Sequence, residues 1–162
     1  MDTSASRKIA ILSVDGINFS SGFVCKELSL FLEDERTSRH YVFKRPIDLQ
    51  LTGSDRKTEF FHHKILGGLR LNDSSVGSLE HYSHVGVIQS LCNYTVYVAG
   101  HVAYKFVTRI IPGSDVYDIQ QIAHHQFPRT LPQSPCGIEH NPRYCSLAKL
   151  WNIREFCINN LF

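Results

Sequence analysis

Apolar runs and turn residues alternate along the first part of the chain and predict three consecutive strands. Residues 9–14 form an apolar run that is too short for an ordinary helix. The turn signal Asp15-Gly16 follows it, so we expect a buried strand that ends there. Residues 22–32 alternate in a way that leaves both faces of a strand partly apolar. Residues 40–44 also alternate and stop before Pro46, which favours a shorter strand near a sheet edge.

Helical spacing begins near residue 55. Residues 55–66 predict a helix with Ser54 as its N-cap and with Phe60, Phe61, Ile65 and Leu66 facing inward. The later predicted elements are a helix at 78–93, a strand at 95–99, a helix at 102–111, a strand at 116–119, an irregular loop at 124–135, and a last helix from Asn141-Pro142 to about residue 159 that buries Leu147, Leu150, Trp151 and Ile158.

The predicted element order is β-β-β-α-α-β-α-β-α. Three strands joined by tight links favour an antiparallel meander, whereas strands reached through helices favour parallel pairing by right-handed crossovers. We therefore predict an α/β domain with a mixed five-stranded sheet, three strands antiparallel and two parallel, and with helices on both faces.

Length and composition favour one domain over residues 1–162, with residues 1–7 as a flexible N-terminus, because 162 residues with 43% hydrophobic content suit a single core. A net charge of +2 excludes a strongly basic nucleic-acid binder, so any such contact needs a local patch. The polar N-terminus and the lack of a run of ~20 apolar residues predict an intracellular protein, in cytoplasm or nucleus, without a membrane span. The five cysteines then favour metal binding or burial over disulfides.

Several short phrases carry a family resemblance. They are Val14-Asp15-Gly16 after the first strand, Ala99-Gly100-His101 after the fourth, the stretch from Tyr117 to Ala123, and His140 followed five residues later by Cys145. With the element order, they resemble the DEDDh exonucleases, which implies a ribonuclease-H-like fold over nearly the whole chain. The stretch Gly22 to Leu28 and a late Cys/His/Cys cluster resemble degenerate exonuclease-like modules of insect mobile elements. The chain is also similar to the Maelstrom domain of the piRNA pathway, which lost the exonuclease carboxylates and carries a Glu-Cys-His-Cys zinc site.

The carboxylates of an ordinary DEDDh exonuclease are missing here. Two-metal cleavage needs about four acids around one point. The first strand supplies only one acid, Asp15, whose ordinary interpretation is a turn residue, and residues 102–107 supply none. The last motif has Cys145 where the family has an aspartate. We therefore predict no catalytic residue and treat Asp15 and Asp118 as vestigial.

A late cluster of metal-binding residue types predicts a zinc site. Cys136-x3-His140-x4-Cys145 offers two thiolates and an imidazole within one short segment, which suits tetrahedral Zn²⁺. Glu27 is the predicted fourth ligand, because we place it on the same strand face as Phe23 and Phe31, where a carboxylate is costly unless it is paired or metal-bound. The Maelstrom resemblance implies the same set. The substitutes for Glu27 are Cys25, Glu139 and Cys157. The plain alternative is a core cysteine, a loop thiol and a solvated histidine.

Basic residues offer a weaker signal. The candidate nucleic-acid contacts are Lys105, Arg109, Arg143 and Lys149, and the alternative is a solvated charged face. We interpret His62-His63 as surface residues. The family resemblance implies a catalytically inactive, zinc-stabilised module that binds RNA or a protein partner in a piRNA or transposon-silencing complex. The alternatives are a single-stranded RNA nuclease that does not use the two-metal centre, and a pure protein-interaction adaptor.

Overall fold

A mixed five-stranded sheet forms the centre of the computed structural model, which describes residues 8–74, 77–123 and 140–162. The strands are β1 (Ile9–Phe19), β2 (Gly22–Leu32), β3 (Thr37–Val42), β4 (Thr95–Val98) and β5 (Asp115–Asp118). Their order in the sheet is β3-β2-β1-β4-β5. The pairs β1–β2 and β2–β3 are antiparallel, and β1–β4 and β4–β5 are parallel. The predicted α/β fold class and mixed sheet are therefore confirmed.

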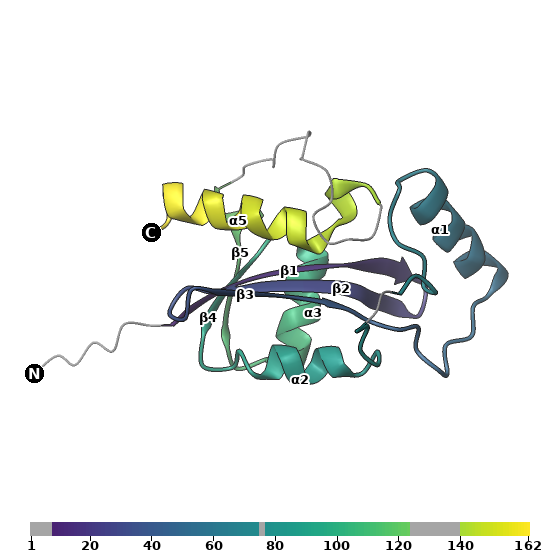
Figure 1. The fold of residues 1–162 in the computed structure, drawn as a ribbon, viewed down its shortest axis with the longest axis horizontal. Coiled ribbons are helices and arrows are strands. Elements are labelled where there is room, and N and C mark those ends of the chain that lie inside the picture. Colours follow the sequence, from purple (N-terminus) through teal and green to yellow (C-terminus); the bar gives the residue numbers. More distant parts are fainter. Residues whose placement is uncertain (1–7, 75–76, 124–139) are drawn as a thin grey trace, which may run out of the picture.

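Helices cover both faces of this sheet (Figure 1). They are α1 (Gly53–Lys64), α2 (Ser83–Gln89), α3 (His101–Ile110), the short α4 (Ile119–Ala123), the 3₁₀ turn η1 (Pro142–Tyr144) and α5 (Ser146–Asn160). Helix α5 lies on one face, α2 and α3 lie on the other, and α1 lies beyond the end of β1 and β2. This layering places the start of α5 over the middle of β2.

Each sheet face has its own apolar core because successive strand side chains point to opposite sides. The core under α2 and α3 includes Ala10, Leu12, Val14, Leu28, Leu30, Ile88, Leu91, Val96 and Val107. The core under α5 includes Ile11, Phe31, Ile119, Leu150, Ile153 and Cys157. Burial of each large side chain contributes about 1.5–3 kcal/mol, so both faces hold their helices by apolar packing.

Strand β1 continues through the predicted turn at Asp15-Gly16. The pairing with β2 shifts there: Asp15 lies opposite Glu27, but Gly16 lies opposite Cys25. A Cβ on residue 16 would stand 2.0 Å from the carbonyl oxygen of Val24, so glycine allows this close approach. The bulge turns Glu27 toward α5 and Cys25 toward the opposite core. Asp15 is thus a mid-strand residue, and our prediction of a turn was wrong.

The bulge also corrects the predicted surroundings of Glu27. Phe31 lies on the α5 side, as expected, but Phe23 packs against the other core and contacts Phe106 of α3 with ring centroids 5.1 Å apart. An extra residue in one strand reverses the side-chain alternation beyond it. A prediction that counts alternate residues along the sequence does not include this reversal.

Helix α1 has the opposite orientation to the predicted one. Phe60, Phe61 and Ile65 are 62%, 51% and 65% exposed, while Asp55 and His62 are buried. The N-cap is Thr52 rather than Ser54, and Thr52 forms a capping box with Asp55. Polar contacts, not an apolar stripe, set how this helix faces the sheet.

Two other helices differ from prediction in extent or orientation. Helix α2 is shorter than the predicted 78–93 because Leu79 forms a β-bridge with Phe43 instead of a helical turn. In α5, Leu150 is buried as predicted, but Trp151 and Ile158 are 40% and 42% exposed. The inward side of α5 is completed by Ile153 and Cys157.

Candidate metal centre and neighbouring cleft

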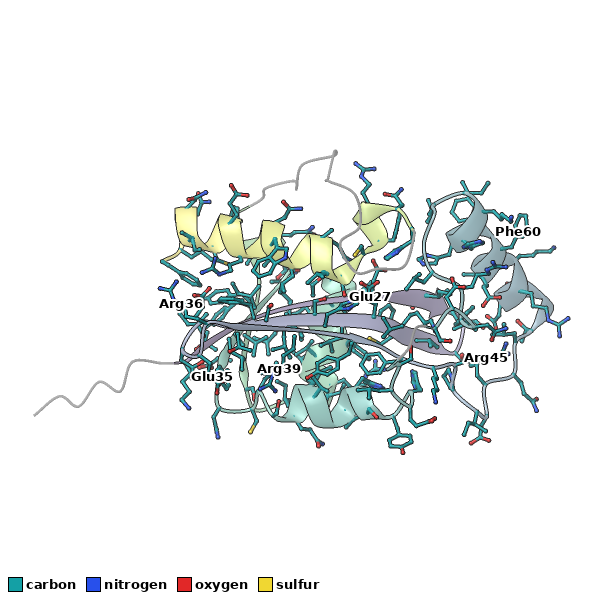
Figure 2. All side chains as sticks on the ribbon, in the orientation of Figure 1. Glu27, Glu35, Arg36, Arg39, Arg45 and Phe60 are labelled. Atoms are coloured by element: carbon teal, nitrogen blue, oxygen red, sulfur yellow. The ribbon has the colours of Figure 1, made fainter. Side chains whose placement is uncertain are left out.

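Three of the four predicted metal ligands come together between the sheet and the start of α5. Glu27 is on β2, His140 precedes η1, and Cys145 is the N-cap residue of α5. Their ligand atoms all lie within 4.8 Å of one another, and this group could hold a metal ion. Figure 2 shows Glu27 under the first turn of α5. Cys136 and the substitute Glu139 lie outside the described residues.

Glu27 is the hub of the group. Its side chain is fully buried. Its Oε1 accepts hydrogen bonds from the backbone N–H of Ser146 at 3.0 Å and from the Cys145 thiol at 3.4 Å. The carboxylate also bonds to Nε2 of His140 at 3.2 Å and to Nε2 of His40 at 2.9 Å. Burial alone would raise the pKa of this carboxyl, but the hydrogen bonds to the two histidines outweigh it and hold the pKa below its ordinary value. Glu27 is therefore a carboxylate, the form that binds metals.

The donor set restricts the kind of ion that would fit. A carboxylate oxygen, an imidazole nitrogen and a thiolate sulfur suit a borderline-soft ion, whereas Mg²⁺ and Ca²⁺ prefer oxygen ligands only. The ligands belong to two segments, one on β2 and one at the start of α5. An ion at this position would therefore tie the last helix to the middle of the sheet.

His40 was not recognised from the sequence. It lies on β3 opposite Ser29, diagonal to Glu27, and reaches the Glu27 carboxylate across the antiparallel pair. Another polar link joins β2 to α5, because the hydroxyls of Ser29 and Ser146 are 2.8 Å apart. The sequence did show a histidine on the predicted third strand. The register of that strand against β2, which brings His40 to Glu27, cannot be predicted from local sequence.

Two substitutes for Glu27 are excluded by position. Cys25 lies in the core on the other side of the sheet, and burial raises the pKa of its thiol. Cys157 packs in the core under α5, three turns beyond Cys145, and burial raises its pKa to about 12. Neither cysteine belongs to the group around Glu27. Both behave as core residues.

A cleft of about 390 Å³ opens beside this group, at the carboxyl ends of β1 and β4. Ligands of open α/β sheets commonly bind at this edge, and the volume lies within the ~300–1,000 Å³ of small-ligand sites. The side chains that line it include Asp15, Phe23, His62, His101, Arg143, Tyr144 and Lys149. Asp15 is the one acid among these lining residues.

Asp15 is paired with a lysine. The Lys149 ammonium lies 3.0 Å from Oδ2 of Asp15 and donates to the carbonyl oxygen of Val14 at 3.0 Å. Burial raises the pKa of Asp15, and the Lys149 charge opposes this rise. Asp118, the other acid that we predicted to be vestigial, does not line the cleft; it accepts from the backbone N–H groups of Gly100 and Gln120. Both acids thus have structural partners within the described part of the chain.

The predicted basic residues separate into two pairs. Arg143 and Lys149 line the cleft, whereas Lys105 and Arg109 of α3 are not among its lining residues. His62 is buried and stands edge-on to Tyr144, with ring centroids 5.4 Å apart, so the prediction of a surface histidine was wrong. Burial lowers the pKa of His62, which favours the neutral ring.

Comparisons of the chain with protein-family models, with curated proteins and with solved structures found no match. Across the ranges that the structure describes, no helix has both the length and the hydropathy needed to cross a bilayer. The exonuclease and Maelstrom resemblances therefore stay predictions from sequence.

Proposed function

We propose that this chain is a catalytically inactive, nuclease-like module, held together by Zn²⁺ at Glu27, His140 and Cys145, that binds single-stranded RNA in its cleft. The observation that carries the proposal is the Lys149 ammonium on Asp15. This ammonium places a fixed positive charge where a catalytic metal ion would need to bind the Asp15 carboxylate.

The zinc part of the proposal rests on the chemistry of the three grouped side chains. A carboxylate oxygen, an imidazole nitrogen and a sulfur from distant segments lie within 4.8 Å of one another, and this set of donors suits Zn²⁺. Cys136 completes the predicted set of four ligands. When bound, Zn²⁺ would supply a cross-link between β2 and α5 and no catalytic chemistry, because four protein ligands close the coordination sphere.

The inactive character is supported by the shortage of acids at the cleft. A two-metal centre needs several ionised carboxylates to neutralise its ions. Among the described residues that line the cleft, Asp15 is the one acid, and Lys149 already neutralises it. Glu27 lies opposite Asp15 in the sheet but is engaged by His40, His140 and the start of α5.

RNA is favoured over a peptide because the cleft combines a cation with aromatic rings. Arg143 offers positive charge for phosphates, and Phe23 and Tyr144 offer rings on which bases can stack. A role in transposon silencing stays a prediction from the family resemblance. Residual nuclease activity and a protein partner are outcomes that the experiment below distinguishes.

The test measures metal content, binding and cleavage on the same full-length protein. We expect about one zinc per chain by elemental analysis, lost in Cys145→Ser but kept in Cys92→Ser, a change at an exposed cysteine. A labelled single-stranded RNA should be retained in a salt-dependent way and stay intact with or without Mg²⁺.

Each part of the proposal has its own contrary result. Cleavage by the wild type that Asp15→Asn abolishes would contradict inactivity. Binding that is absent even at low salt would contradict RNA recognition and leave a protein partner. A metal-free protein with unchanged stability in chelator would contradict the zinc.

A further inference from the structure

The outward face of α1 carries an unusual combination of side chains. Along one side of the helix, the exposed residues are Arg56, Lys57, Phe60, Phe61, Lys64 and Ile65. Phe60 is 62% exposed and Phe61 51%, although large apolar side chains are normally buried. In Figure 2, Phe60 points away from the sheet. The two acids of the helix lie elsewhere: Asp55 is buried, and Glu59 accepts from the backbone N–H of Leu71.

Cations and rings alternate on this face rather than separating into two stripes. Residues four apart stand above one another on a helix, so Arg56, Phe60 and Lys64 form one row. Lys57 and Phe61 form the start of the neighbouring row. Each ring therefore has a positive charge one turn away, and no exposed acid of α1 opposes these charges.

The same helix forms part of the cleft. His62, on the inward side of α1, lines the cleft beside Tyr144. The outward face lies one helix diameter away, ~10 Å. A nucleic-acid strand that leaves the cleft past α1 needs only a few nucleotides to reach Phe61 and Phe60.

We infer that the outward face of α1 is a second binding surface for single-stranded RNA, on which bases stack against Phe60 and Phe61 while phosphates pair with Arg56, Lys57 and Lys64. This inference rests on the proposed RNA binding and extends it beyond the cleft. Interleaved charges and rings match a strand in which phosphates and bases alternate. A helix that lies on an anionic membrane instead separates its charged face from its apolar face.

The test compares a short and a long oligouridylate, of about 4 and about 16 nucleotides, by fluorescence anisotropy on the full chain. The variant F60A/F61A removes both rings. These rings are exposed and alanine is the best helix former, so the variant should fold and melt like the wild type. The matched control is Ile47→Ala, which removes an apolar side chain that is 89% exposed but lies outside α1.

We expect F60A/F61A to bind the long oligomer at least about tenfold more weakly, since stacking on each ring accounts for roughly a 5- to 150-fold change, and to bind the short oligomer normally. Ile47→Ala should bind both like the wild type. A second variant, K57Q/K64Q, should reduce the slope of log affinity against log salt for the long oligomer by about 0.7 per lysine.

The outcomes separate the two proposals. If the wild type binds neither oligomer, both the proposed RNA binding and this inference are wrong. If it binds, but F60A/F61A keeps wild-type affinity for the long oligomer, only this inference is wrong. Equal weakening for both oligomers would also overturn it, because the rings would then support the cleft. The same variant is also tested on phosphatidylserine vesicles. If F60A/F61A loses a vesicle binding that the wild type shows but keeps its RNA affinity, the face binds a membrane instead.

Discussion

Replacing Glu27 by glutamine tests whether the buried carboxylate organises the end of the fold. The change keeps the shape of the side chain but removes its charge. Four groups bond to this carboxylate: the Ser146 N–H, the Cys145 thiol and the two histidines His40 and His140. Since bonds to a charged acceptor are roughly twice as strong as neutral ones, each contact should lose about 0.5–1 kcal/mol.

The sum is a loss of about 2–4 kcal/mol in the free energy of unfolding, before any metal is considered. This is a large fraction of the ~5–15 kcal/mol that stabilises a typical domain. At about 2–4 °C per kcal/mol for a chain of this size, Tm should fall by roughly 5–15 °C. Chelator should lower the Tm of the wild type and leave that of Glu27→Gln nearly unchanged, because that variant has lost a ligand.

Urea and thermal unfolding followed by circular dichroism, with and without EDTA, supply the measurement. Glu33→Gln is the matched control, because Glu33 also bonds to α5, through Arg154 at 2.8 Å, but the pair is partly exposed. Such pairs contribute at most ~1 kcal/mol. Equal losses of stability in the two variants, or an equal response to EDTA, would refute the role assigned to Glu27.

Three further predictions concern other buried polar or close contacts. Lys149→Met leaves the buried carboxylate of Asp15 unpaired and should cost about 3–5 kcal/mol in urea unfolding, with most of the loss restored by adding Asp15→Asn; a neutral single variant would contradict this. Burial lowers the pKa of Lys26 from 10.5 to about 8, while its ammonium donates to the carbonyl oxygens of Phe43 and Leu71. The unfolded chain then holds more protons between these pH values. The stability of the wild type relative to Lys26→Met should therefore increase by up to about 3 kcal/mol between about pH 7.5 and pH 10.5, and a flat difference would exclude the shift. Gly16→Ala should cost at least about 1–3 kcal/mol, because its Cβ would overlap a carbonyl oxygen of β2, and unchanged melting would show that the bulge adapts.

The sequence was most informative where local pattern and tertiary structure agree. Strand β2 has the predicted bounds, and β4 and α3 differ from prediction by one residue at one or both ends. The convergence of Glu27, His140 and Cys145 was also predicted correctly. A carboxylate in the middle of an apolar strand needs a partner, and the late His/Cys cluster offered one, so the chemistry of the residues carried long-range information.

Local pattern failed where distant polar contacts decide the orientation of an element. In α1, the spacing of Phe60 and Phe61 suggests an inward apolar stripe. The helix instead turns Asp55 inward, where its Oδ1 accepts from the Ser20 hydroxyl at 2.9 Å. A strand bulge had the same effect on Phe23, and the contact of His40 with Glu27 depends on the register of β3, which local pattern does not give. None of these contacts has a signature within a window of ten residues.

Asp15 and Glu27 lie opposite one another on β1 and β2, and the last segment of the chain supplies groups that contact both acids. Two carboxylates directly opposite one another on neighbouring strands repel, and the Glu27 charge contributes to raising the pKa of Asp15. The segment from His140 to Lys149 supplies counter-groups to both acids: imidazole and thiol to Glu27, ammonium to Asp15. Docking of this segment therefore gives partners to both acids in one step. Undocking would remove Lys149 from Asp15 and would leave Glu27 with His40 of β3 among its four bonded groups. Because the same segment brings Arg143 and Tyr144 to the cleft, the proposed RNA-binding surface should form only when α5 is docked on the sheet.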